Sequence, residues 1–248
     1  MESYCITDVG RIRSVNQDYV FASDTPVGRL PNLFVVADGM GGHNAGDRAS
    51  SYAVEVFLRN VRWERDKNPI RIIRRSIEKA NTKVLEEANS REKYQGMGTT
   101  MVVATIVKDI LYVANVGDSR LYLIGGKSIR QITRDHSLVE EMIRAGGLTR
   151  EEGRYHPDKN VITRAIGVEE RVAIDFFDVQ VSKNDTLLLC TDGLSNMLTD
   201  EEMKRIITEE SSLRIAGKRL VEAANKNGGS DNITALLVRP RGNEVKKC

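Results

Sequence analysis

Carboxylates at the ends of apolar runs are the residues of this sequence best suited to chemistry. The run Leu33–Ala37 has the length and β-branched content of a buried strand, and it stops at Asp38 before a turn rich in glycine. Glycine lets a backbone approach a bound group closely, because it has no Cβ and accepts positive φ at little steric cost. Asp and Gly are also ordinary turn residues, so this stretch alone does not define a site.

The same arrangement recurs along the chain. Four further aspartates lie beside predicted strands: Asp18, Asp118, Asp192 and Asp231. Burying such carboxylates together is costly unless cations pair with them. Oxygen ligands suit hard cations such as Mg²⁺ or Mn²⁺, whereas the chain has only three histidines for an imidazole-rich site and three cysteines without CxxC spacing. We therefore predict a site for divalent cations.

Such a site indicates phosphoester hydrolysis. Two ions about 3.5–4 Å apart and bridged by an aspartate can hold a hydroxide and clamp a phosphoryl group for in-line attack. A phosphoryl group also calls for a matching cation, and Arg13, five residues before Asp18, is the best-placed candidate. The alternative for Arg13 is a surface arginine without a role, which spacing alone favours.

Sequence periodicity predicts the elements that position these residues. From Ala45 onward, apolar residues recur every three or four positions, which predicts two amphipathic helices divided at Asn68-Pro69. The remaining predictions are strands in 1–37, two hairpins in 96–131, a short helix at 138–145, a polar segment at 146–160, strands at 172–179 and 186–190, helices at 199–207 and 213–225, and a last strand at 233–238. Because the strands connect mainly through hairpins, this order favours an antiparallel α+β fold over a doubly wound parallel sheet.

Composition limits the class of protein. The chain has 248 residues and no Pro/Ser/Gly-rich linker, so we expect one domain. Its net charge of +2 is too small to suggest nucleic-acid binding. The longest apolar run, near Met101–Val107, is too short to span a membrane, and the first residues lack the pattern of a signal peptide. An odd number of cysteines fits a reducing compartment, so we expect a cytoplasmic protein.

Eight short motifs carry a resemblance to one family. They are RSVNQD at 13–18, VADGMGGHNAG at 36–46, GTT at 98–100, NVGDSR at 115–120, TRDHS at 133–137, ITRAIG at 162–167, CTDGLSN at 190–196 and GGSDNIT at 228–234. In this order they resemble the metal-dependent protein serine/threonine phosphatases, the PPM or type 2C family, in their compact bacterial form. The resemblance implies a single catalytic domain over 1–248 with a four-layer αββα sandwich, in which helix pairs flank two antiparallel sheets.

The resemblance also implies roles at the metal centre. Asp38 resembles the aspartate that bridges both core metals, and the Gly39 carbonyl resembles a ligand of one of them. Asp192 and Asp231 resemble ligands of the other core metal. Asp18 resembles the aspartate that acts through metal-bound water.

Other residues resemble those that surround the metal centre in the family. Asp118, together with Asp192, resembles the pair that holds a weaker third metal. Arg13 resembles the phosphate-binding arginine, so the resemblance favours a phosphate-binding role over that of a surface arginine without a function. Many animal relatives have a histidine, proposed as leaving-group acid, where this chain has Met40, so His43 three residues later is a candidate for that acid or for ordering its loop. Residues 144–161 resemble the flap beside the cleft, and 241–248 form a basic tail.

The function implied is hydrolysis of phosphoserine and phosphothreonine in proteins by direct attack of a metal-bridging water or hydroxide. Arg13, Asp38 and Asp192 would be catalytic, with Mn²⁺ or Mg²⁺ as cofactor. We expect a monomer whose partners are phosphorylated proteins, including a Ser/Thr protein kinase. A silent member that only binds phosphoproteins is disfavoured because every metal carboxylate is present. A phosphohydrolase with a nucleophilic aspartate is disfavoured because 36–40 lacks an Asp-x-Asp pair.

Overall fold

The computed structural model describes residues 1–42, 45–126 and 128–240, and within them the strands form two antiparallel sheets. His43 and the predicted tail 241–248 lie outside these ranges. The five-stranded sheet has the order β1 (Glu2–Asp8), β11 (Ile233–Arg239), β10 (Thr186–Cys190), β7 (Arg120–Gly125) and β8 (Ser128–Gln131). The six-stranded sheet has the order β2 (Asp18–Ser23), β3 (Leu33–Met40), β5 (Met101–Val107), β6 (Ile110–Val116) and β9 (Asp175–Gln180), and β4 (Gly98–Thr99) pairs with β3 outside that order.

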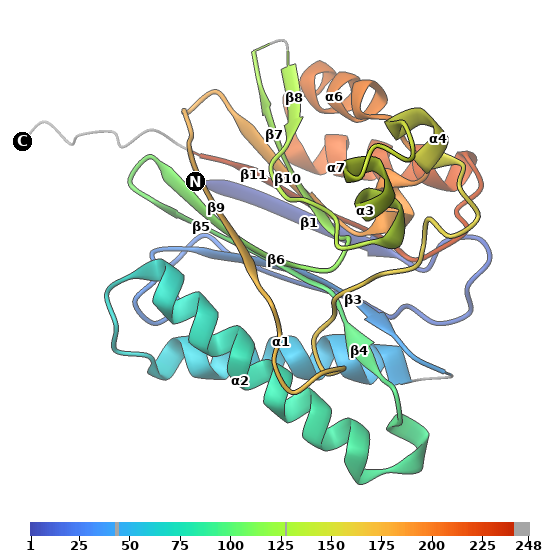
Figure 1. The fold of residues 1–248 in the computed structure, drawn as a ribbon. Coiled ribbons are helices and arrows are strands. Elements are labelled where there is room, and N and C mark those ends of the chain that lie inside the picture. Colours follow the sequence, from blue (N-terminus) through green and yellow to red (C-terminus); the bar gives the residue numbers. More distant parts are fainter. Residues whose placement is uncertain (43–44, 127, 241–248) are drawn as a thin grey trace, which may run out of the picture.

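Helix pairs cover the outer faces of both sheets (Figure 1). The pair α1 (Ala45–Trp63) and α2 (Pro69–Ser90) packs on the six-stranded sheet, and α6 (Asp200–Glu209) and α7 (Leu213–Lys226) pack on the other. Shorter helices are η1 (Glu92–Tyr94), α3 (Leu138–Arg144), α4 (Arg150–Arg154) and α5 (Asp192–Ser195). The predicted α+β class and αββα layers are confirmed. No helix in the described ranges is long and apolar enough to cross a bilayer.

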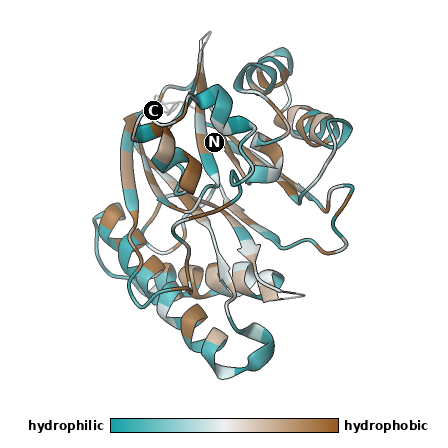
Figure 2. Ribbon diagram, turned by 45° about the vertical axis from the view of Figure 1, so that its right-hand side comes forward, coloured by the Kyte–Doolittle hydropathy of each residue, from teal (hydrophilic) through white to brown (hydrophobic). Residues whose placement is uncertain are grey.

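Continuous apolar runs form the central strands because these strands are buried on both faces. Phe34 belongs to the core between the two sheets, whereas its neighbour Val35 belongs to the core under α1 and α2. In the same way, Leu188 belongs to the core under α6 and α7, and Leu189 belongs to the core between the sheets. Figure 2 shows hydrophobic colouring along the strands and a mixture of hydrophilic and hydrophobic segments on the helices. The alternation decides which of the two layers each side chain enters.

Antiparallel register brings distant carboxylates to one end of the sandwich. Asp18 at the start of β2 lies directly opposite Asp38 near the end of β3. Like charges in opposed positions destabilise a sheet unless something compensates them. Repulsion between the two aspartates therefore lowers the stability of the sheet at this point.

Three details differ from the sequence prediction. The polar segment 146–160 contains helix α4, which begins with a capping box between Thr149 and Glu152. Helix α5 has only four residues, too few to give a helical period. Strand β9 begins at Asp175 instead of 172, so the predicted strand started too early.

Candidate metal and phosphate site

A cleft of about 300 Å³ collects most of the predicted site residues. Its lining includes Arg13, Asp38, Gly39, Asp118, Asp192 and Asp231. These residues come from both sheets: Asp38 and Gly39 lie near the end of β3, Asp118 lies in the turn between β6 and β7, and Asp192 follows β10. Asp18 is buried and does not line the cleft. His43 lies outside the described residues, so its two predicted roles stay predictions.

Close backbone contacts hold the turns that carry these carboxylates. At Gly39, a Cβ would collide with the carbonyl oxygen of Gly46, which lies in the first turn of α1. At Gly193, a Cβ would collide with the carbonyl of Asn232, so glycine allows the Asp192 turn to approach the Asp231 turn. The sequence signal was the glycine after each aspartate.

Hydrogen bonds fix the backbone of Asp38. Its amide donates to Thr100 Oγ1 at 2.9 Å, and its carbonyl accepts from the Thr100 amide and the Thr99 hydroxyl, both at 2.8 Å. Thr100 Oγ1 also lies 2.8 Å from Ser119 Oγ, beside Asp118. The GTT motif at 98–100 thus joins two of the carboxylate turns.

Two buried threonines orient the Asp18 carboxylate. Thr191 and Thr234 donate hydroxyl hydrogen bonds to Asp18 Oδ2 at 2.8 and 2.6 Å. Asp18 Oδ1 is buried and has no hydrogen-bond partner among the described residues. Sequence analysis missed both threonines, although each lies within three residues of a predicted ligand, Asp192 or Asp231. A buried carboxylate oxygen without a partner is costly, which leaves a position for a cation or its hydration water.

Burial and mutual repulsion act on the whole carboxylate cluster. Burial is the main cause that raises the pKa of Asp18 to about 7 and that of Asp192 to about 6, and nearby aspartates add to it. The pKa values of Asp38 and Asp118 are also raised well above their ordinary value, again mainly by burial and then by neighbouring aspartates. A bound cation would reverse this trend, because it favours ionised carboxylates.

The donor set is open on one side. Within 1–42, 45–126 and 128–240, no three His, Cys, Asp or Glu residues are grouped so as to hold an ion by themselves. Mg²⁺ and Mn²⁺ tolerate such a site, because they take oxygen ligands and Mg²⁺ usually keeps several waters. The carboxylate oxygens of the lining and the unpartnered Asp18 Oδ1 therefore fit hard divalent cations better than a closed zinc site.

Arg13 lies at the exposed side of this cluster. Its Nη2 donates to Asp231 Oδ2 at 2.9 Å, and about half of its side chain is exposed to solvent. A guanidinium in that position has donors left for the oxygens of an incoming phosphoryl group.

Comparisons with known proteins agree with this geometry. The family model described as protein phosphatase 2C matches residues 11–237. The chain is similar to the serine/threonine phosphatase stp of Listeria welshimeri, with 42% identity over 240 residues, 94% of this chain and 93% of that protein. It is also similar to the protein phosphatase PhpP of Streptococcus pneumoniae, with 41% identity over 96% of this chain and 97% of that protein.

Solved structures show the same likeness. Serine/threonine phosphatase Stp1 from Staphylococcus aureus superposes with a TM-score of 0.91 at 34% identity, covering 97% of this chain and 95% of that one. The catalytic domain of the phosphatase PstP, described in complex with 2 manganese ions, gives a TM-score of 0.84 at 28% identity, covering 95% and 96%.

Proposed function

The chain belongs to the protein phosphatase 2C family and is a protein serine/threonine phosphatase, and we propose that its cleft aspartates hold the catalytic divalent cations. Asp38, the Gly39 carbonyl, Asp192 and Asp231 would be the ligands of two core ions, and Asp18 would act through water. The observation that carries this proposal is the convergence of buried, mutually repelling carboxylates on a cleft with Arg13 at its open side. The manganese reported for PstP supports the choice of Mn²⁺ or Mg²⁺.

The chain's own residues prepare the reaction. Bound divalent cations would supply activation of water at neutral pH and neutralise charge on the phosphoryl oxygens. Arg13 binds the phosphate of the phosphoserine or phosphothreonine and orients its phosphorus toward the carboxylates. Asp38 and Asp192 stay ionised when cations are bound and fix the geometry of the cleft. Thr191 and Thr234 keep the Asp18 carboxylate oriented toward the same centre.

Asp118 supports a weaker third site. It lines the same cleft, and Asp192 is the neighbouring carboxylate that most raises its pKa after the effect of burial. We expect Asp118→Ala to bind one ion fewer than the wild type at saturating Mn²⁺ in isothermal titration. Equal stoichiometry would remove the third site from the proposal.

The biological setting is also part of the proposal. The whole chain would form one catalytic domain that works as a monomer in the cytoplasm. Its substrates would be phosphorylated proteins, including a Ser/Thr protein kinase whose action it reverses. The support is chemical, because hydrolysis of phosphoserine and phosphothreonine undoes the reaction of such a kinase.

Turnover of matched phosphopeptides tests the proposal. Phosphoserine, phosphothreonine and phosphotyrosine peptides of one sequence should be assayed after EDTA treatment and after addition of Mn²⁺ or Mg²⁺. We expect hydrolysis of the first two only when a divalent cation is present. Full activity in EDTA would contradict the metal mechanism, and a trapped aspartyl-phosphate would replace it with a nucleophilic aspartate. No turnover under any condition would indicate a silent, binding-only protein.

A further inference from the structure

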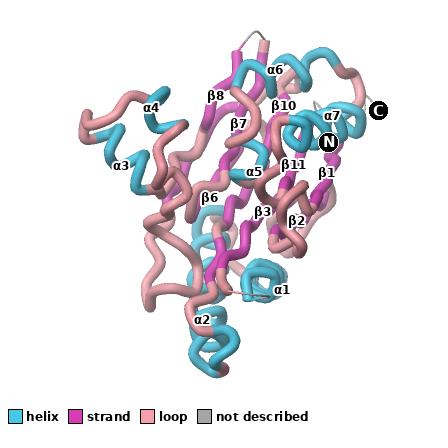
Figure 3. The backbone as a smooth tube through the Cα atoms, turned by 90° about the vertical axis from the view of Figure 1, so that its right-hand side faces the viewer, coloured by secondary structure: helices cyan, strands magenta, loops and turns pink. Residues whose placement is uncertain are grey.

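A second cavity of about 210 Å³ lies between the flap and the body of the enzyme. We call it the flap cavity. Arg154 and Lys159 line it from the flap, and Arg120, Ser195, Asn196 and Asp200 line it from the body. Figure 3 shows α3 and α4 beside β7 and β8, outside the two helix pairs of the sandwich. None of the catalytic residues proposed above lines this cavity.

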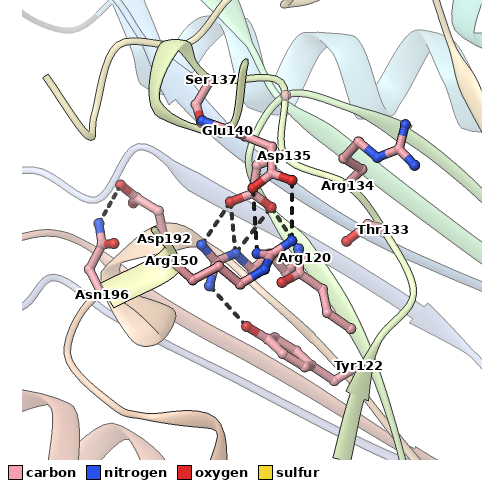
Figure 4. A network of polar contacts seen from close by, with 12 residues as sticks. Arg120, Tyr122, Thr133, Arg134, Asp135, Ser137, Glu140, Arg150, Asp192 and Asn196 are labelled. Atoms are coloured by element: carbon pink, nitrogen blue, oxygen red, sulfur yellow. Dashed lines mark hydrogen bonds and ion pairs between the residues drawn. The ribbon is translucent and has the colours of Figure 1, made fainter. Parts of the chain in front are cut away.

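The flap cavity and the catalytic cleft are neighbours. Lys159 lines the cavity, while the next residue, Asn160, lines the cleft. On the body side, Asn196 lines the cavity and donates to Oδ2 of the cleft residue Asp192 at 3.0 Å (Figure 4). A peptide advances by about 3.3–3.6 Å per extended residue. A substrate with its phosphoresidue in the cleft can therefore present a residue a few positions away to the flap cavity.

Ion pairs neutralise part of the charge around the cavity. Arg120 binds Asp135 through Nε and Nη2 at 2.7–3.1 Å, and Gln131 donates to the same carboxylate at 2.7 Å. Arg150 pairs with Glu140 at 3.3 Å (Figure 4). The carboxylates of Asp135 and Glu140 are therefore already paired.

Arg154 and Lys159 are left without an ion pair among the described residues. Asp200 is the acidic lining residue outside the two pairs. Among the lining residues, two cations without an ion pair thus face one such carboxylate, and the Arg154 charge also acts on Glu202 outside the lining. This balance favours an anion.

Ser195 adds an independent indication of a ligand. Ser195 is one of the lining residues and only 3% of it is exposed, yet its Oγ has no hydrogen-bond partner among the described residues. A buried hydroxyl without a hydrogen-bond partner destabilises the folded state. An oxyanion in the cavity would accept a hydrogen bond from it and would pair with both cations.

We propose that the flap cavity binds a second phosphate group, and that this group is carried on a residue near the phosphoresidue undergoing hydrolysis. Arg154 and Lys159 supply the charge, and Ser195 supplies a directed hydrogen bond. The enzyme would then prefer segments that carry two phosphates close together. The inference rests on the proposed function, because the first phosphate must lie in the cleft.

Three peptides test the proposal. They share one phosphothreonine sequence and carry alanine, glutamate or a non-hydrolysable phosphonate analogue of phosphoserine at a scanned position two to four residues away. We expect the phosphonate to raise kcat/KM about tenfold over alanine, the gain that roughly 1.4 kcal/mol of binding gives. The Arg154→Gln/Lys159→Gln double variant should lose this gain but hydrolyse the alanine peptide and a small aryl phosphate as the wild type does. Ser195→Ala should lose part of it.

Arg144→Gln is the matched control, because Arg144 is an exposed cation of the same flap that does not line the cavity. It should keep the full gain. Free phosphate is the other source of the same chemistry: a noncompetitive effect of inorganic phosphate on aryl phosphate hydrolysis, lost in the double variant, would assign the cavity to that ion instead of to the substrate. Equal kcat/KM for all peptides without such an effect, a glutamate gain equal to the phosphonate gain, or a gain that survives in the double variant would overturn the proposal. Failure of the proposed function would look different, since no peptide would then be hydrolysed.

Discussion

The carboxylate turns and the flap face the same region of the enzyme, but they are held in different ways. Asp38 lies near the end of a strand that pairs with β2 on one side and β5 on the other, and its backbone is fixed by Thr99 and Thr100. Helix α3, which leads into the flap, and the flap helix α4 are short, and the ion pair between Arg150 and Glu140 joins them. Rigid sheet ends suit chemistry that needs fixed distances, whereas a lightly packed segment suits the recognition of varied proteins.

The flap is attached mainly at its base. Leu138 N donates to Val161 O at 2.9 Å and Thr163 N donates to His136 O at 2.8 Å, so the chain before α3 meets the chain that leaves the flap. His136 also accepts from Gly117 N at 3.0 Å through Nδ1, which connects this base to the turn of Asp118. Between these anchors, few buried apolar side chains stabilise the segment, so it should open at lower free energy than the sheets.

The largest effect should come from the carboxylate side. Asp38→Asn keeps the size of the side chain but removes a charge from the centre that the cations occupy. We expect kcat to fall about 1,000-fold, the upper end of the loss when one group that stabilises a transition state is removed. The measurement is phosphopeptide turnover at saturating Mn²⁺. Near wild-type turnover would exclude Asp38 from the metal centre.

A smaller effect should follow from loosening Asp18. Thr191→Val and Thr234→Val preserve shape but remove the hydroxyl donors to Asp18 Oδ2. Partners that orient metal ligands typically contribute about 10–100-fold to metal affinity or activity, so we expect a loss in that range, seen as a higher Mn²⁺ requirement. Thr105→Val is the matched control, because Thr105 is equally buried but donates to Asn32 O far from the cleft lining. An equal loss in the control would indicate a general packing effect.

Arg13 should show the next effect in size. Arg13→Ala removes charge-assisted hydrogen bonds worth about 1.5–3 kcal/mol each, so kcat/KM should fall about tenfold or more. Arg13→Lys should recover only part of it, because an ammonium cannot reproduce the planar guanidinium. The comparison of KM and kcat for both variants shows whether the contact tightens in the transition state. Identical kinetics for Lys and Arg would mean that only charge matters.

The flap should respond to packing changes with altered substrate preference. A Cβ on Gly153 would meet Val139 Cγ1 and Ile143 Cδ1 at 2.8 Å, so Gly153→Val should push α4 away from α3. We expect kcat/KM for a phosphoprotein to fall several-fold while hydrolysis of an aryl phosphate changes less than about twofold. A proportional loss on both substrates would show that the flap supports the carboxylate turns, against the contrast drawn above.

The same contrast explains what could be predicted from sequence. Asp38 and Asp192 were recognisable because an apolar run ends at each, and a run of that kind predicts where a strand meets the edge of a sheet. Thr234 was not, because its role depends on how β11 of one sheet packs against β2 of the other, which brings its hydroxyl to Asp18. Arg154 and Ser195 were missed since α4 and α5 are too short to give periodicity, and only tertiary packing places them around one cavity.

The smallest effect concerns the stability of the metal-free protein. Asp18 and Asp192 have folded-state pKa values raised to about 7 and about 6, mainly by burial, so between their ordinary range and these values the folded state binds more protons than the unfolded state. Stability must then fall as pH rises from about 4 to 7, the reverse of the usual behaviour of paired carboxylates. We expect the melting temperature in EDTA to decrease by a few degrees from this source across that interval, and Asp18→Asn to flatten the decrease.

Saturating Mn²⁺ should cancel or invert the slope, because the cation binds the ionised carboxylates. A melting temperature in EDTA that rises with pH, with no change in Asp18→Asn, would show that the carboxylate turns relieve their repulsion without a cation.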